Sequence, residues 1–288
     1  MRLRLLAGLL VVGGGLLLLP PAAGPASAQT ALSMEGGARI AALGGTGAAL
    51  TGPGAWTNPA GPATLDGRTA AFYVTQGFGL SELRLGTLRY AEPLAGWGTV
   101  VGSARTFGFD AFRETAFALS YARGFSLGTA RRVHAGVRAR YYRLSLGDAS
   151  DGASYGSAGT LGLSAGMVVQ LVERLTLGAT AVNLNAPAYT DSGPGLAQTL
   201  AVGLAYRPAD RLLVTAAAHK DLDFPLSVRA GLEATPVEAL AVRVGVSTRP
   251  ARLTAGVGLR VEWLRGRLAF ERHRTLGWTP AAELVVQW

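Results

Sequence analysis

The sequence predicts an all-β protein: a closed antiparallel transmembrane β-barrel of about 14 strands, preceded by a short N-terminal hatch or plug segment. Three observations lead to this class. The chain begins with an export leader, its composition is poor in charge and rich in glycine, and apolar residues alternate with small or polar ones up to the last residue. We expect a signal peptide over residues 1–28, the hatch segment over 29–68 and the barrel over 69–288.

The first 28 residues have the three parts of a secretory signal peptide. Arg2 and Arg4 form a positive start, Leu5–Leu19 forms an apolar stretch, and Ala26–Ala28 is a small-residue cleavage site. The apolar stretch is too short for a membrane anchor and ends at a proline pair. We therefore expect cleavage after Ala28, export, and localisation in the outer membrane of a Gram-negative-type bacterium.

Composition excludes several other classes. Only 16% of the residues are charged, against roughly 25% in soluble domains, and 40 of the 288 residues are glycine. After the leader, no apolar run reaches the roughly 18 residues of a membrane-spanning helix. The formal net charge is +9, but the cations occur singly instead of in a tract, so we expect no nucleic-acid partner. The chain has no cysteine, so disulfides cannot stabilise it.

The alternation indicates which face of each strand meets lipid. In 253–263, Leu, Ala, Val and Trp alternate with Thr, Gly, Arg and Glu, and the stretch 133–142 has the same period. A face of Gly, Ala, Ser and Thr is a poor coat for a soluble protein but a suitable lining for a crowded lumen. We therefore expect the apolar faces to point outward to lipid.

Counting these segments gives an even number of strands, which returns the C-terminus to the side where the first strand begins. Short turns are expected at 92–96, 172–174, 207–211, 235–239 and 264–267, and longer outer connections at 147–157 and 186–197. Leu88 and Tyr90 fall on the opposite face from Leu83 and Leu85, which suggests a bulge near Gly86. The expected strands are 69–77, 82–91, 97–107, 113–123, 132–145, 158–171, 175–186, 198–207, 212–221, 226–234, 240–249, 252–264, 267–273 and 280–288.

The end of the chain is a candidate assembly signal. Its last strand alternates and finishes in Trp288. Such an ending resembles the signal by which the outer-membrane assembly machinery recognises its barrels. The alternative is an edge strand that ends in tryptophan. On the first reading the partners are that machinery and outer-membrane lipid.

The segment 29–68 breaks the alternation and is divided into short turns by glycine and proline. It has no preceding strand and lacks the glycine pattern of a dinucleotide-binding loop. Its apolar residues would be left in water if it hung free, so we expect it to pack in the lumen.

This segment also carries a resemblance to a known family. The phrase at 38–45, Ala-Arg-Ile-Ala-Ala-Leu-Gly-Gly, and the phrase at 56–61, Trp-Thr-Asn-Pro-Ala-Gly, resemble the opening of PorV/PorQ-type outer-membrane proteins, relatives of the FadL fatty-acid channels. Segments at 183–185, 204–208, 229–233 and 267–288 resemble later strands of that family. The stretch 50–54 departs from it, because the family commonly has an acidic pair there. The resemblance implies a fourteen-strand barrel with a hatch whose motif is Gly44, Gly45, Trp56, Asn58, Pro59, Ala60 and Gly61.

The sequence shows no residue pattern typical of a catalytic or metal-binding site. The three histidines, His134, His219 and His273, are far apart and lack metal-ligand spacing, and Ser164 does not lie in a nucleophile elbow. We expect no enzyme activity, no metal and no cofactor.

Charged residues on the inward faces are the remaining site candidates. They either form a structural ladder of ion pairs or attract anions into a pore. Glu271 is a further expected partner of the arginines. The residues expected to face the lumen are Arg138, Arg140, Arg229, Glu233, Arg243, Arg260 and Glu262.

Two functions follow from the resemblance, both in transport or export across the outer membrane. The PorV/PorQ likeness implies that the barrel anchors or shuttles exported proteins, as in type IX secretion. The alternative is a FadL-like passive channel for hydrophobic or small organic solutes, or a purely structural barrel. The partners would then be exported proteins or a lipophilic solute. A general porin is disfavoured, because no connection has the length of a constricting loop that folds inward.

Overall fold

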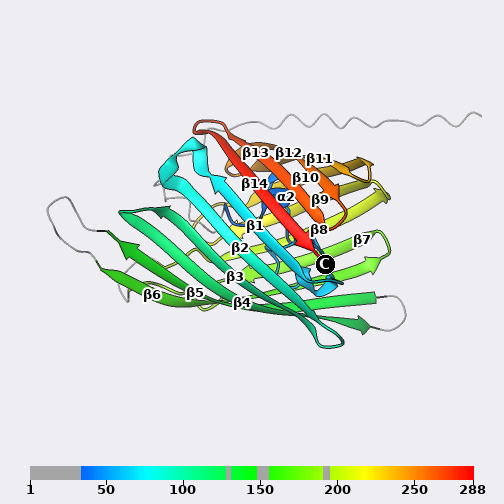
Figure 1. Ribbon diagram of the computed structural model, residues 1–288, viewed down its shortest axis with the longest axis horizontal. Helices are drawn as coiled ribbons and strands as arrows, with labels where there is room; N and C mark the ends of the chain where they lie inside the picture. Colours follow the sequence, from blue (N-terminus) through cyan, green and yellow to red (C-terminus); the bar gives the residue numbers. More distant parts are fainter. Residues whose placement is uncertain (1–33, 128–130, 148–155, 191–194) are drawn as a thin grey trace, which may run out of the picture.

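The chain forms one closed antiparallel barrel of fourteen strands, in which β1 pairs with β14 and every other strand pairs with its sequence neighbours (Figure 1). The computed structural model describes residues 34–127, 131–147, 156–190 and 195–288. The predicted fold class of a closed barrel of about 14 strands is confirmed. The predicted signal peptide and its cleavage site after Ala28 lie outside the described residues.

The strands begin and end within a few residues of most of the expected positions. Strands β4, β5 and β6 have 16 residues each and extend beyond the others (Figure 1). The strands are β1 (Thr69–Gln76), β2 (Arg84–Leu94), β3 (Gly98–Phe109), β4 (Phe112–Leu127), β5 (Arg131–Leu146), β6 (Ser157–Val172), β7 (Leu175–Val182), β8 (Thr199–Ala209), β9 (Leu212–Asp221), β10 (Ser227–Val237), β11 (Leu240–Thr248), β12 (Ala251–Val261), β13 (Leu264–His273) and β14 (Gly277–Gln287).

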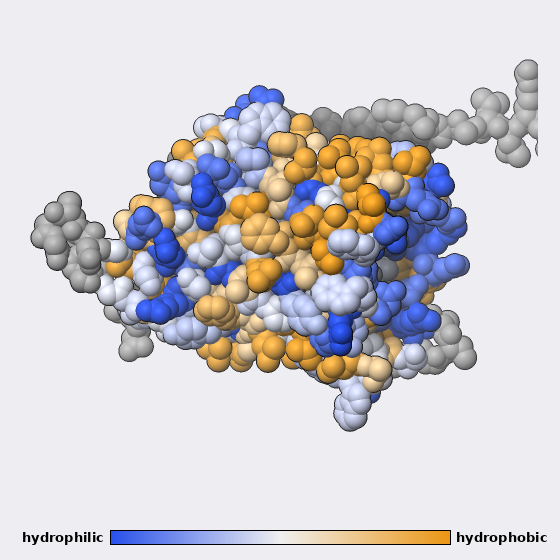
Figure 2. All heavy atoms as spheres, in the orientation of Figure 1, coloured by the Kyte–Doolittle hydropathy of each residue, from blue (hydrophilic) through white to orange (hydrophobic). Residues whose placement is uncertain are grey.

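The apolar faces of the strands point outward. On β12, the outward Leu253 and Leu259 are 58% and 59% exposed, whereas the inward Thr254 is buried. Apolar residues lie across the middle of the visible surface, and hydrophilic residues concentrate towards its two ends (Figure 2). This inside-out distribution is the one that a barrel needs when its outer surface meets hydrocarbon.

Aromatic residues lie at both ends of the barrel. Thr69 of β1 pairs with Gln287 of β14, so the barrel has a terminal end, where the chain enters and leaves, and an opposite end. Trp97, Trp263 and Trp288 are exposed at the terminal end, and Trp278 is exposed at the opposite end. Aromatic residues at two levels are typical of the two interfaces of a membrane barrel.

Strand β2 has no bulge near Gly86, contrary to the expectation. Its pairing with β1 is continuous from Thr69–Ala91 to Gln76–Arg84. Leu85 points inward and is fully buried, and Leu88 points outward and is 58% exposed. The apolar residue on the inward face packs against residues inside the barrel, so the change of face needs no extra residue in the strand.

The turn between β12 and β13 lies three residues before the expected position. β12 ends at Val261 and β13 begins at Leu264, so the turn consists of Glu262 and Trp263. Glu262 has a positive φ of 49°. The alternation of residue types continues through this two-residue turn, and the pattern alone therefore places it too late.

Residues 34–68, the inner segment, lie inside the barrel. They include α2 (Ala38–Ala42) and the 3₁₀ turn η1 (Gly61–Thr64). Two further 3₁₀ turns, η2 (Gly77–Gly79) and η3 (Ser81–Leu83), lie between β1 and β2. In the described ranges, no helix is long and apolar enough to cross a membrane.

The closure of the barrel gives a first prediction. Phe72 pairs directly with Leu284 across β1 and β14, whereas Ala282 pairs with Val74. Because the chain has no cysteine, the double variant F72C/L284C forms a unique disulfide under mild oxidation, since directly opposed residues are close enough for one. The band shift of the oxidised chain on a denaturing gel is the measurement. F72C/A282C, whose partners are offset by two residues, crosslinks poorly; efficient crosslinking of that variant and none of F72C/L284C would contradict the register.

Candidate functional site

The candidate site is the lumen, where the inner segment packs against the barrel wall. Its apolar residues join three buried clusters with inward residues of the strands. This packing removes apolar side chains from water. The clusters combine Ala38 and Ala42 with Tyr73, Leu85 and Phe107; Leu43 and Leu50 with Ala205 and Leu213; and Trp56 and Leu65 with Val101 and Val285.

Inward-facing glycines let the backbone of the inner segment approach the wall. A Cβ atom built on Gly178 of β7 would overlap the carbonyl of Ala48, and one built on Gly136 of β5 would overlap the backbone of Pro59. Gly245 of β11 meets Gly44 in the same way. The tiny inward residues that mark the sequence are therefore required by the segment that the wall encloses.

Asn58 ties the inner segment to itself and to the wall. Its Nδ2 donates to the carbonyl oxygen of Ala48 at 2.6 Å, and lies 3.1 Å and 3.2 Å from the carbonyl oxygens of Met167 on β6 and Ala179 on β7. Its Oδ1 accepts the backbone N–H of Ala60 at 2.9 Å. The side chain is fully buried, so these contacts satisfy groups that water cannot reach.

The other residues of the predicted hatch motif shape the backbone of the segment. Gly44 and Gly45 follow α2 with φ values of 69° and 83°, which other residues rarely adopt. The N–H of Gly61 donates to the carbonyl oxygen of Asn58 at 3.0 Å. Trp56 is buried, and its Nε1 donates to Glu283 of β14 at 3.2 Å.

Two buried ion-pair groups hold the middle of the inner segment. Arg39 of α2 makes two hydrogen bonds to Glu233 of β10, at 2.9 Å and 2.8 Å, and Arg243 of β11 contacts the same carboxylate at 2.5 Å. Arg267 of β13 donates to Glu283 at 2.9 Å and to the carbonyl oxygen of Pro53 at 3.0 Å. Each buried carboxylate thus has cationic partners, which offset its cost of desolvation.

A third group surrounds Glu35, at the start of the described inner segment. Its carboxylate accepts Nη2 of Arg140 at 2.7 Å and Nη1 of Arg105 at 3.0 Å, and lies 3.6 Å from Nη2 of Arg89. Burial alone would raise the pKa of this carboxyl, but the arginines outweigh it and hold the pKa well below its usual range. Arg105 also pairs with Glu114 of β4.

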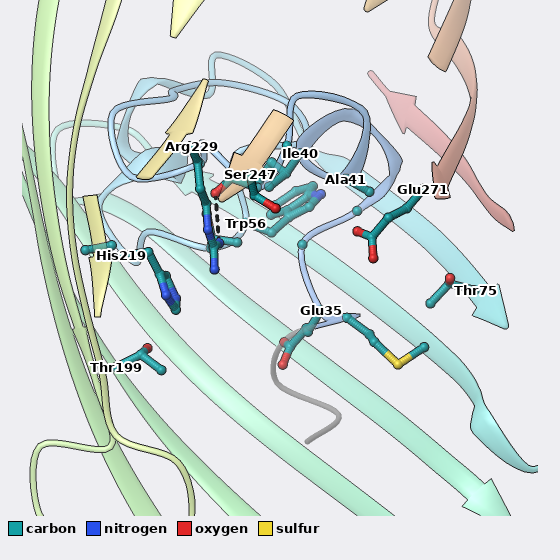
Figure 3. A pocket seen from close by; sticks show the side chains of 18 of the residues that line it. Glu35, Ile40, Ala41, Trp56, Thr75, Thr199, His219, Arg229, Ser247 and Glu271 are labelled. Carbon is teal, nitrogen blue, oxygen red and sulfur yellow. Dashed lines mark hydrogen bonds between the residues drawn. The ribbon is translucent and has the colours of Figure 1, made fainter. Parts of the chain in front are cut away.

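A cavity of about 170 Å³ lies between the inner segment and the wall, in the half of the barrel nearer the opposite end. Glu35, Ile40, Trp56, His219, Arg229 and Glu271 surround it (Figure 3). Its lining combines apolar side chains such as Val182 and Phe78 with hydroxyl groups and charges.

Arg138 and Arg229 line this cavity without a carboxylate partner among the described residues. Arg138 donates to Ser120 Oγ at 2.9 Å and to the carbonyl oxygen of Trp56 at 2.7 Å. Arg229 reaches only the carbonyl oxygen of Gly45, at 3.4 Å (Figure 3). Arg252, in contrast, pairs with Glu271 at 2.9 Å. The cavity lining therefore includes two guanidinium groups that no carboxylate of the described residues pairs with, beside three carboxylates.

The connection between β7 and β8, expected as an outer connection over 186–197, turns partly inward. In its described part, Asn183, Pro187 and Ala197 are buried, and Asn183 Nδ2 donates to the carbonyl oxygen of Ala197 at 2.9 Å. Tyr189 donates to Glu114 at 3.1 Å. Ala197 lines the cavity, so this connection contributes to the wall instead of lying wholly outside.

The residues expected to face the lumen separate into two sets. Arg260 lies on the same face of β12 as the inward Thr254, but near the terminal end, where it is exposed; Glu262 lies in the following turn and is exposed. Trp288 is exposed, and its ring centroid lies 6.3 Å from that of Tyr90. Those on the inward faces are Arg138, Arg140, Arg229, Glu233 and Arg243.

Sequence reasoning missed several lumen residues. Arg89 and Arg105 lie on β2 and β3, where mixed faces obscured the register, although the outward Leu88 and Tyr90 on either side of Arg89 would have placed it inward. Glu283 and Arg267 were not singled out, and nothing local to Glu35 indicates partners on three strands. Within the described ranges, no cluster of His, Cys, Asp or Glu could hold a metal ion.

The close approach at Gly178 gives a second prediction. In Gly178→Ala the new methyl overlaps the Ala48 carbonyl, so the inner segment shifts or the barrel loses about 1–3 kcal/mol of stability. Faster hydrogen exchange of residues around Ala48 and a lower unfolding temperature are the expected readings. Gly102→Ala on β3, where a Cβ meets no atom within 4 Å, is the matched control. Equal behaviour of the two variants would show that the segment does not lie against β7.

Comparison with known proteins gives a likeness of fold. No protein-family model and no curated protein sequence matches the chain. A FadL homologue of Pseudomonas aeruginosa aligns with a TM-score of 0.58 and 14% identity over 88% of this chain and 98% of that one. The toluene transporter TodX of Pseudomonas putida aligns with a TM-score of 0.54 and 14% identity over 87% and 96%. The monoaromatic hydrocarbon channel CymD aligns with a TM-score of 0.56 and 12% identity over 87% and 95%. The chain therefore has the barrel fold of FadL-type channels.

Proposed function

We propose that this chain is an outer-membrane channel that takes small hydrophobic or amphipathic organic solutes into its lumen and releases them past the inner segment. The observation that carries the proposal is the cavity between the inner segment and the wall. It has apolar surfaces and a few convergent polar groups, which is the usual make-up of a small-molecule site. The solved structures of similar fold include a toluene transporter and a monoaromatic hydrocarbon channel.

The outer surface supports the membrane location. Large apolar side chains cover the outward faces of the strands, and tryptophans lie at both ends. A surface of this kind is stable in lipid and aggregates in water. The expected export leader agrees with that location, and so does the Trp288 ending, which we propose is read by the outer-membrane assembly machinery.

Release of a solute requires the inner segment to move. On the terminal side of the cavity, the backbone of the segment lies directly against the wall at Gly136 and Gly178. Many of its fixings are hydrogen bonds and ion pairs, such as those of Asn58 and Arg39. Polar contacts of this kind can be exchanged for contacts with water at modest cost. The segment therefore acts as a hatch.

Export of proteins, as in the PorV/PorQ family, is the second function that the sequence raises. Its support is the resemblance over 38–45 and 56–61. In this chain, however, Asn58 and Gly61 make hydrogen bonds that hold the inner segment in the lumen. A solute channel needs such a segment as much as an export protein does, so the motif does not favour export. The described outer connections also offer little surface for gripping a cargo protein.

Uptake through the cavity is the third prediction. Ala201→Trp places a large side chain on a cavity-lining position of β8, so uptake of radiolabelled toluene by Gram-negative cells that produce the variant falls to that of cells without the chain. Ala218→Trp, on the exposed outward face of neighbouring β9, leaves uptake unchanged.

Heat-dependent gel migration checks that both variants form barrels. Wild-type uptake no greater than that of cells without the chain would leave a structural barrel as the better reading. Such an outcome together with a stoichiometric exported protein in the purified material would favour the secretion role.

A further inference from the structure

The arginines around Glu35 provide more hydrogen-bond donors than this carboxylate uses. Arg89 of β2, Arg105 of β3 and Arg140 of β5 converge on it. All three guanidinium groups are buried, with side-chain exposures of only 3–4%. We call these three arginines the cradle.

Several donors of the cradle have no acceptor. Nη1 and Nη2 of Arg89 and Nε of Arg105 are buried and have no hydrogen-bond partner among the described residues. Among the described residues, Glu114 is the only other carboxylate in contact with the cradle, through Arg105. Buried guanidinium N–H groups without acceptors are unfavourable, so the site favours an anion with more oxygen atoms than Glu35 alone provides.

Glu35 and α2 are held to the wall by separate contacts, with two glycines between them. Gly36 and Gly37 separate it from α2, and Gly37 has a φ of 88°. α2 itself is held separately by the Arg39–Glu233 pair at 2.8 Å. Two glycines between the two fixings allow the backbone to turn there.

The cradle meets the cavity through Arg140. Glu35 and Arg140 both line the cavity, and so does Arg138, two residues before Arg140 on β5. Figure 3 shows Glu35 at its edge, with Ile40 and Trp56 on the inner segment nearby. A solute whose apolar part lies in the cavity can thus bring a charged end to Arg140.

Building on the proposed function, we infer that the cradle is a binding site for the carboxylate of a small organic anion, and that Glu35 is the chain's own occupant, which the solute replaces. The bound carboxylate takes the donors that now serve Glu35 and reaches those of Arg89 that have no partner. The solute class is therefore organic carboxylates with a compact apolar body.

The test measures equilibrium binding of benzoate and of uncharged benzyl alcohol to the purified full chain by calorimetry. Glu35→Ala removes the competing carboxylate, so benzoate binds about tenfold tighter or more, the value of one charge-assisted hydrogen bond. Benzyl alcohol binds as it does to the wild type. Glu35→Gln, which keeps the volume and most contacts, gives a gain in the same direction if the alanine variant folds poorly.

Two further variants complete the test. Glu82→Ala changes an exposed glutamate of η3 and leaves both affinities unchanged. Arg140→Gln in the Glu35→Ala background abolishes the gain for benzoate. No gain in Glu35→Ala and Glu35→Gln, or an equal gain for benzyl alcohol, would overturn the inference.

The failure of this inference and that of the proposed function are distinguishable. If toluene uptake depends on Ala201 but benzoate shows no specific gain in affinity, the channel function is supported and the carboxylate site is contradicted. If benzoate shows the specific gain in affinity but the cells take up no toluene, the cradle is supported as an anion site and the channel function is contradicted.

Discussion

A closed sheet of fourteen strands encloses more space than small inward side chains can fill, and the rest of this structure follows from how that space is occupied. The backbone of the inner segment lies directly against the backbone of the wall, as at Ala48 and Gly178. Backbone groups shielded from water in this way need partners. The Nδ2 of Asn58, with its two N–H groups, lies within hydrogen-bond distance of three carbonyl oxygens, two of which belong to the wall. The glycines of the wall and the polar side chains of the segment are therefore two parts of one arrangement.

Buried ion pairs also hold the inner segment to the barrel wall. Glu233 and Glu283 belong to the wall and hold Arg39 and Trp56 of the inner segment, whereas Glu35 belongs to the segment and is held by arginines of the wall. Buried ions persist only with partners, so each group fixes one point of the segment. The Glu35 group differs from the others because it has surplus donors and lies beside the cavity. A plug fixed in this way can fill the lumen and still release one end.

Alternation predicts the strands well, because lipid and lumen impose different residues on alternate positions. It fails where the environment breaks the rule. Leu85 is apolar and points inward because it meets the inner segment and not lipid. Glu262 keeps the alternation although it lies in a turn, so the pattern cannot locate the strand end. Glu35 carries no local signal at all, since its partners come from three strands distant in the sequence. Sequence periodicity therefore does not predict the long-range contacts inside the lumen.

The central claim is that the inner segment is a packed part of the lumen. Hydrogen exchange of the full chain in lipid nanodiscs tests it most directly, residue by residue. The N–H groups of Ala60, bonded to Asn58 Oδ1, and of Gly45, bonded to the carbonyl oxygen of Ile40, are predicted to exchange far more slowly than exposed amides, because both are hydrogen-bonded inside the barrel, Ala60 fully buried and Gly45 half-buried. Exchange of these amides at the rate of an unstructured peptide, while the strands remain protected, would contradict the account.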